Sequence, residues 1–217
     1  ANCEKLQRHM QLLLKKGSLY KVYNNNLLYH GCVPLNEDGS FKEVEVYGRT
    51  YKGRELYDVL EAYVRKAFFA LDKEEKQRGR DILWFIWSSP SSPLFGKDKM
   101  ATFERYFLAE KETHVENKNP YYRLLEDESV VDNIFREFGI EGDCCHIING
   151  HVPVHHTSGE SPIKCGGKVL VIDGGFSKAY QKETGIAGYT LIYNSWGMIL
   201  AAHEPFTSAE DAITRES

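Results

Sequence analysis

The β-type segments of this chain lie toward its two ends, and a long helical block separates them. Apolar residues recur at helical spacing over residues 55–70, 73–87 and 121–138, inside a block that covers residues 53–140. Short runs typical of strands flank the block: residues 19–23, 27–29, 146–148, 168–172, 189–193 and 198–202. This order predicts an α/β or α+β sheet whose strands are interrupted by an inserted helical block.

Length and composition limit the classes of protein to consider. A chain of 217 residues is long enough for one domain or two small ones. The formal net charge of −4 argues against a nucleic-acid binder that relies on bulk charge. No apolar run approaches the roughly 20 residues of a membrane helix, and no secretory signal opens the chain. Five cysteines without a C-x-x-C spacing indicate reduced thiols. We therefore expect a soluble cytoplasmic protein with neither a nucleic-acid nor a membrane partner.

Two histidines stand close behind short apolar strand-like runs. His30 follows residues 27–29 directly, and His151 follows residues 146–148 after Asn-Gly. Residues just past a strand end project into the crevice where such sheets bind ligands, and imidazole is a common metal ligand. Two imidazoles that converge from neighbouring strand ends would form half of a metal site. From the pattern alone, two unrelated loop histidines remain the commoner explanation.

Four stretches resemble the bacterial class III fructose-1,6-bisphosphatases, a branch of the calcineurin-like metallophosphoesterases. The His-Gly-x-x-Pro run and the later Gly-His-x-Pro run resemble the two downstream metal-ligand motifs of that superfamily. The stretches are NLLYHGCVPLNEDGS (residues 26–40), SPLFGKDKM (92–100), INGHVPV (148–154) and VIDGGFSKAY (171–180). The likeness runs essentially from end to end.

The resemblance implies a fold, a reaction and a cofactor. The expected fold is α/β, part of a calcineurin-like metallophosphoesterase β-sandwich with flanking helices and an inserted helical block. The expected reaction hydrolyses fructose 1,6-bisphosphate to fructose 6-phosphate and phosphate, as in gluconeogenesis. The family uses a two-metal centre, usually with Mn²⁺, and a metal-bridging water or hydroxide as the nucleophile. By position, His30 and His151 inherit the role of ligands to one of the two ions.

The sequence departs from the family in a way that predicts a partial chain. The upstream ligand motifs Asp-x-His, Gly-Asp-x-x-Asp-Arg and Gly-Asn-His are absent. Residues 1–217 are therefore expected to be a partial metallophosphoesterase domain that lacks its N-terminal half, including the bridging aspartate and the general acid. The start without Met and the polar end of the chain agree with this interpretation. We expect the isolated chain to be inactive.

A bisphosphate substrate requires cations that bind its phosphates. Lys97, Lys99 and Arg105 lie in and just after a Ser-Pro/Phe-Gly loop that matches the family, and Lys178 follows a Gly-Gly pair. We expect these four residues to bind substrate. The Gly-Gly pair could also present backbone N–H groups to phosphate.

Other residues have an ordinary structural explanation beside the functional one. Lys164 and Lys168 are further candidate phosphate donors, but a single lysine is more often a solvated surface charge. Trp84, Phe85 and Trp87 are expected in the core of the helical block rather than on a sugar-binding surface.

Two alternative functions remain open at the level of sequence. A phosphoprotein phosphatase of the same superfamily would share the His-Gly and Gly-His motifs, although the long helical block argues against it. A non-catalytic module that binds a phosphorylated metabolite would explain the missing acidic ligands. Neither the oligomeric state nor any effector site follows from the sequence.

Overall fold

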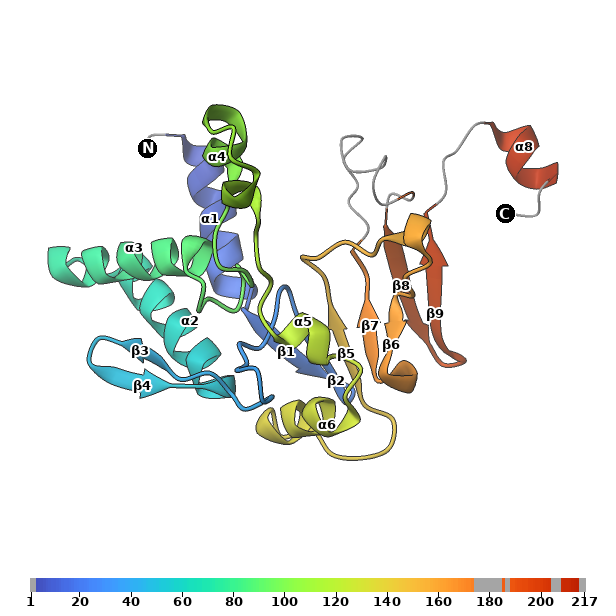
Figure 1. Ribbon diagram of the computed structural model, residues 1–217. Helices are drawn as coiled ribbons and strands as arrows, with labels where there is room; N and C mark the ends of the chain where they lie inside the picture. The colour runs from blue at the N-terminus through green and yellow to red at the C-terminus, as the bar shows by residue number, and fades with distance from the viewer. Residues whose placement is uncertain (1–2, 174–184, 186–187, 204–207, 215–217) are drawn as a thin grey trace.

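A five-stranded mixed sheet forms the centre of the computed structural model, which describes residues 3–173, 185, 188–203 and 208–214 (Figure 1). The strand order is β1-β2-β5-β7-β6. The three inner strands are parallel, and an antiparallel strand lies at each edge. The bounds are β1 Tyr20–Tyr23, β2 Asn26–Tyr29, β5 His146–Asn149, β6 Ile163–Lys164 and β7 Val169–Val171. The carboxyl ends of the parallel strands therefore lie along one edge of the sheet.

The first hairpin forms because its turn suits asparagine. Asn24 and Asn25 have φ values of 47° and 58°, which a two-residue turn of type I′ requires and asparagine tolerates. The turn pairs Tyr20 with Tyr29 and Tyr23 with Asn26. β2, which ends directly before His30, is thereby held between β1 and β5 inside the sheet.

The helical block lies between β2 and β5, as the sequence predicts. It follows a second hairpin, β3 (Val44–Val46) and β4 (Arg49–Tyr51). Its elements are α2 (Gly53–Phe69), α3 (Lys73–Ser88), α4 (Thr102–Phe107), η1 (Lys111–His114), α5 (Tyr121–Leu124) and α6 (Glu128–Glu137). Further 3₁₀ turns are η2 (His156–Ser158) and η3 (Cys165–Gly167).

The expected single helix over residues 121–138 is two helices. The Asp127 side chain accepts a hydrogen bond from the backbone N–H of Ser129, and this cap starts α6 anew after α5 has ended. The apolar periodicity continues across the break, which explains why the pattern alone predicts one helix.

Two apolar cores hold the molecule together. In the larger core, one face of the sheet packs against α5 and α6. The sheet contributes Leu27, Ile147 and Val169, α5 contributes Tyr121, and α6 contributes Ile134. A smaller core joins the β3–β4 hairpin to α2 and α3 through Val44, Val46, Leu56, Leu60, Ile82 and Ile86. The helical block thus has a core of its own.

Two of the aromatic residues expected in that core lie outside it. Trp84 and Trp87 are 64% and 63% exposed. Helix α3 turns Gly79, Ile82 and Ile86 toward the interior, and the two indoles contact each other on the other side of the helix. Phe85 alone of the three packs against the smaller core.

The remaining elements are peripheral. β8 (Tyr189–Asn194) and β9 (Gly197–Ala202) form a separate two-stranded sheet, followed by α8 (Ala209–Thr214). Helix α1 (Glu4–Lys16) has no buried residue.

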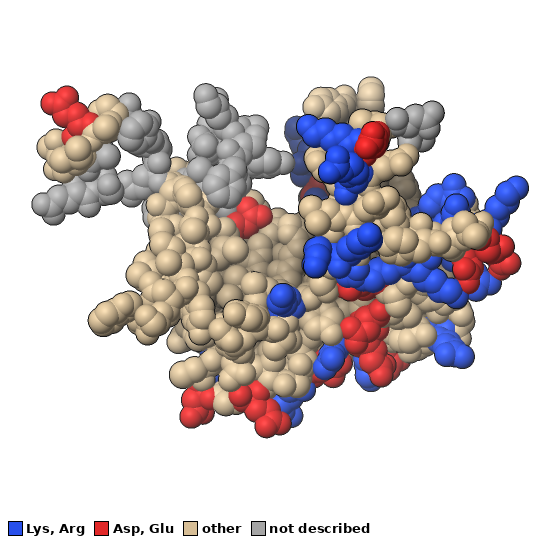
Figure 2. All heavy atoms as spheres, turned by 180° about the vertical axis from the view of Figure 1, so that it is seen from behind, with Lys and Arg blue, Asp and Glu red and all other residues tan. Residues whose placement is uncertain are grey.

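From behind, Lys and Arg side chains gather mainly over the helical half of the molecule (Figure 2). Among the described helices, none combines the length and the apolar character that a membrane span requires.

Candidate metal centre

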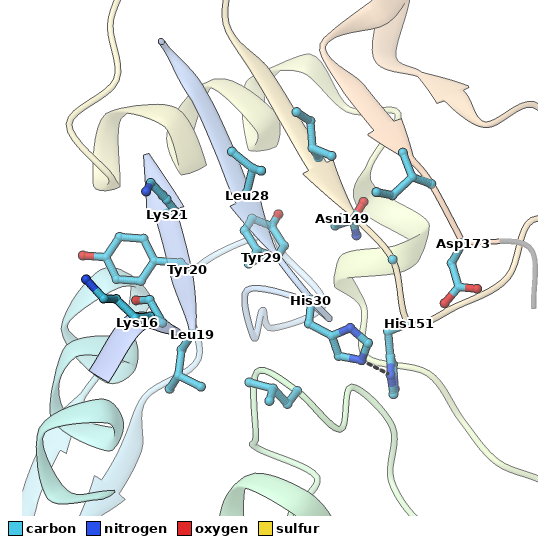
Figure 3. A pocket seen from close by; sticks show the side chains of 15 residues that line it. Lys16, Leu19, Tyr20, Lys21, Leu28, Tyr29, His30, Asn149, His151 and Asp173 are labelled. Carbon is cyan, nitrogen blue, oxygen red and sulfur yellow. Dashed lines mark hydrogen bonds between the residues drawn. The ribbon is translucent and has the colours of Figure 1, made fainter. Parts of the chain in front are cut away.

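His30 and His151 meet at the carboxyl ends of two adjacent parallel strands. β2 pairs with β5 in a register that matches Leu28 with Ile148, and the backbone N–H of Gly150 donates to the carbonyl of His30 over 2.9 Å. The two rings point toward each other, with His30 Nε2 and His151 Nδ1 3.1 Å apart (Figure 3). Histidines separated by 121 positions in the sequence therefore share one site.

A tight backbone turn aims His151 at this site. His151 has a φ of 69°, and the N–H of Val152 donates to the carbonyl of Gly150 over 2.9 Å. This geometry is a γ-turn with His151 at its centre, a rare and strained conformation for a residue with a side chain. Strain of this kind is concentrated at functional sites because the surrounding structure has to maintain it.

A loop from the helical block fixes the proton on His151. His151 Nε2 lies 2.8 Å from the carbonyl oxygen of Phe95, so Nε2 carries the hydrogen and donates it. The other ring nitrogen, Nδ1, then faces His30 with its lone pair. Metal-binding histidines in proteins are held in the same manner by a carbonyl or carboxylate behind the ring.

The pair has the dimensions of two ligands on one divalent ion. With metal–nitrogen bonds of about 2.1 Å, two imidazole nitrogens would lie roughly 3.0 Å apart at a right angle and about 3.4 Å apart at a tetrahedral angle. The observed 3.1 Å is the length of a hydrogen bond that His30 Nε2–H donates to His151 Nδ1, and it also falls between these two values. Within the described residues, however, no group of three or more His, Cys, Asp or Glu side chains has metal-binding geometry. The two histidines thus fit part of a coordination shell.

The environment of His30 favours its neutral form. Partial desolvation of the ring lowers the pKa of His30, and the neighbouring His151 lowers it further, while Asp173 acts in the opposite direction. Because a metal binds the neutral imidazole, this shift favours metal binding by His30 near neutral pH.

Asp173 is a member of this site that the sequence analysis did not identify. It follows β7 by two residues, so three neighbouring parallel strands each place a polar side chain at the same edge. Asp173, His30 and His151 line one open cavity of about 620 Å³ (Figure 3). A sequence signal is present, since Asp173 comes just after the apolar run 168–172, but the Gly-Gly pair that follows it is the more conspicuous feature of that stretch.

The three expected phosphate-binding residues of the loop are engaged within the protein. Lys97 Nζ lies 2.7 Å from Glu116 Oε2, and Arg105 lies 3.5 Å from Glu116 Oε1. Lys99 Nζ donates to the carbonyl of Thr113 over 2.8 Å. Lys97 is two residues from Phe95, which contacts His151. Lys178 and the Gly-Gly pair lie outside the described residues. The substrate-binding roles of these residues remain predictions.

Lys164 and Lys168 lie away from the candidate centre. Lys168 directly precedes β7, so it lies at the amino end of that strand, opposite the end that leads to Asp173. Its ammonium pairs with Glu128 and Asp132 of α6, and Lys164 pairs with Glu160. Both lysines therefore have structural partners.

Comparison with known proteins gives one consistent family. The sequence profile of a family described as Firmicute fructose-1,6-bisphosphatase matches residues 1–217. A Clostridioides difficile protein named Fructose-1,6-bisphosphatase class 3 is 61% identical over 99% of the chain and 32% of its own length. A Clostridium novyi protein of the same name is 56% identical over 99% of the chain and 32% of its own length. A Listeria monocytogenes protein of that name is 55% identical over 100% of the chain and 33% of its own length. No solved structure matches significantly.

Proposed function

The chain belongs to the Firmicute fructose-1,6-bisphosphatase family, and on that premise we propose that it forms part of a cytoplasmic enzyme that hydrolyses fructose 1,6-bisphosphate to fructose 6-phosphate and phosphate. The chain spans about a third of the length of the curated relatives it matches. The observation that carries the proposal is the convergence of His30 and His151 at adjacent strand ends, with their nitrogens 3.1 Å apart.

We further propose that His30 and His151 hold one Mn²⁺ of a two-metal centre. Such ions lower the pKa of bound water and compensate the charge of a phosphate ester. His30 contributes Nε2, and His151 contributes Nδ1 because its Nε2–H is bonded to the Phe95 carbonyl. The carboxylate of Asp173 provides negative charge at the same cavity. The parent fold proposed for this centre is the calcineurin-like metallophosphoesterase sandwich.

The isolated chain is proposed to be inactive. The sequence contains none of the upstream motifs that supply the bridging aspartate, the asparagine ligand and the general acid in the resembling family. Two neutral imidazoles make only a weak divalent site. Lys97, Lys99, Arg105 and Lys178 are proposed to bind the phosphates of the substrate, with Lys97 and Arg105 exchanging Glu116 for phosphate.

The test is phosphate release in the presence of Mn²⁺ by a chain extended to the length of the curated relatives. We expect release from fructose 1,6-bisphosphate, and a loss of at least about 100-fold in H30A and in H151A, because removing a first-sphere ligand disables the centre. Release from a phosphopeptide but not from the sugar bisphosphate would contradict the proposed substrate. Full activity of both variants would contradict the proposed ligands.

A further inference from the structure

We propose that Asn149 is a positioning residue that sets the spacing of His30 and His151. The inference deepens the proposed function and rests on it for the identity of the ion. Asn149 is the last residue of β5, two positions before His151, and its side chain is 2% exposed. Figure 3 shows it at the end of β5, on the strand that leads to His151.

The Asn149 amide joins the two histidine-bearing loops. Its Nδ2 lies 3.1 Å from the carbonyl oxygen of Gly31, the residue directly after His30. The backbone adds a second link of the same kind, from the N–H of Gly150 to the carbonyl of His30. The loop after β2 is thus attached at two successive carbonyls to the loop after β5.

Buried tyrosines hold the amide and its neighbours in place. Asn149 Nδ2 also lies 3.2 Å from Tyr121 Oη, so both amide hydrogens are donated. The Tyr121 hydroxyl is then free to donate to Tyr29 Oη, 2.5 Å away. Tyr57 Oη donates to the carbonyl of Cys32 over 2.7 Å and fixes the next residue of the loop. A connected set of buried polar groups therefore links the residues on both sides of His30 to Asn149.

Stability alone does not explain an asparagine at this position. Asn149 Oδ1 is buried and has no hydrogen-bond partner among the described residues. A buried polar atom without a partner is unfavourable, and the preceding positions of β5 are occupied by Ile147 and Ile148. What the amide provides, and an apolar residue of similar shape would not, is the pair of donated hydrogen bonds that attaches Gly31.

The variants that test this role are N149A and N149L. Leucine resembles asparagine in shape and keeps the strand packed if the alanine variant should fail to fold. The matched control is N26A. Asn26 is also buried, but it lies at the far end of the same sheet, where it contacts the Asn24 carbonyl and His146.

The first measurement needs no metal. The ¹⁵N shifts of the imidazoles, measured on the full chain at neutral pH, report which ring nitrogen carries the hydrogen. We expect the wild-type chain and N26A to show His151 with the hydrogen on Nε2. We expect N149A and N149L to show both rings moving toward the average of the two tautomers, with an otherwise native spectrum.

The second measurement uses Mn²⁺ as the probe, through its broadening of the imidazole signals. The half-maximal Mn²⁺ concentration should rise roughly tenfold or more in N149A and N149L, as for other residues that orient metal ligands, and should stay unchanged in N26A.

Two results would overturn the role of Asn149: ring shifts in N149L identical to those of the wild type, or the same change in N26A as in the Asn149 variants. If Mn²⁺ broadens neither ring of the wild-type chain at the millimolar concentrations that suit a weak site, the proposed metal function fails. The metal-free ring shifts still decide whether Asn149 positions the histidines.

Discussion

At the scale of single residues, the γ-turn centred on His151 orients one of the two rings of the candidate centre. It turns the ring toward His30 while the Phe95 carbonyl holds the far nitrogen. The positions of both histidines near strand ends can be predicted from the sequence, because the apolar runs before them are short and well bounded. The tautomer of His151 cannot, since the Phe95 carbonyl comes from a loop 56 positions away.

The pKa of His30 gives a pH prediction. It lies below the ordinary histidine value of about 6.5, so the ring stays neutral to a lower pH than a free histidine. The His30 ring of the metal-free chain should therefore take up its proton with a midpoint below that ordinary value. An NMR titration of the imidazole signals between pH 4 and 8 measures this. A midpoint above the ordinary value would contradict the lowered pKa of this ring.

Gly31 gives a prediction about packing. A Cβ atom there would overlap the carbonyl oxygen of Pro93, so G31A must push away the loop that leads to Phe95. We expect a loss of about 1–3 kcal/mol in unfolding free energy together with weaker Mn²⁺ binding. Thermal unfolding and Mn²⁺ titration measure the two effects.

The control for G31A is G48A. Gly48 has a φ of 77° and lies in the β3–β4 turn, where an added methyl group would meet no atom within 4 Å. Alanine there should reduce stability through backbone strain and leave Mn²⁺ binding unchanged. Equal losses of Mn²⁺ affinity in both variants would mean that the loop contact has no specific role.

At the scale of elements, the sequence predicts which strands carry the site but not every boundary. The apolar runs predict β2 and β5. The order of strand-like and helical patterns along the sequence predicts that the helical block is inserted between them. The exposure of Trp84 and Trp87 could not be predicted, because apolar residues lie on several sides of α3. Only the packing of α3 against α2 determines which of these sides is buried. The same strand-end rule applies to Asp173, but the Gly-Gly pair dominates that stretch, and no local pattern shows that β7 pairs with β5.

Glu61 links α2 to the junction of α1 and β1. It accepts hydrogen bonds from Ser18 Oγ, the N–H of Leu19 and Arg65. Partial burial would raise the pKa of Glu61, but these bonds outweigh burial and lower it. A carboxylate with a lowered pKa stabilises the fold above its ordinary pKa and loses this contribution as the pH falls through the folded value.

The wild-type chain should therefore lose more stability than E61Q between pH 5 and pH 3. At pH 5 the wild type should be the more stable of the two, because glutamine cannot replace the charged bonds to Arg65. Thermal midpoints of both proteins at the two pH values give the comparison. A parallel decline of the two midpoints would show that Glu61 contributes no pH-dependent stability.

At the scale of the whole molecule, one sheet edge gathers residues from distant parts of the sequence. This edge can be predicted from the sequence, because the carboxyl ends of neighbouring parallel strands lie at the same edge of a sheet. The contact between the helical block and that edge, through Pro93 and Phe95, is a tertiary feature that no local pattern contains. The second core around α2 and α3 explains why this long insertion keeps its own shape and can present its loop to the histidines.

The central claim is that His30 and His151 bind the same ion. Electron spin echo envelope modulation of a chain extended to the length of the curated relatives, loaded with Mn²⁺, tests it most directly. The wild-type spectrum should show two imidazole nitrogens coupled to one Mn²⁺, and H30A and H151A should each show one fewer. A wild-type spectrum without coupled nitrogen, or one that neither substitution changes, would contradict the claim.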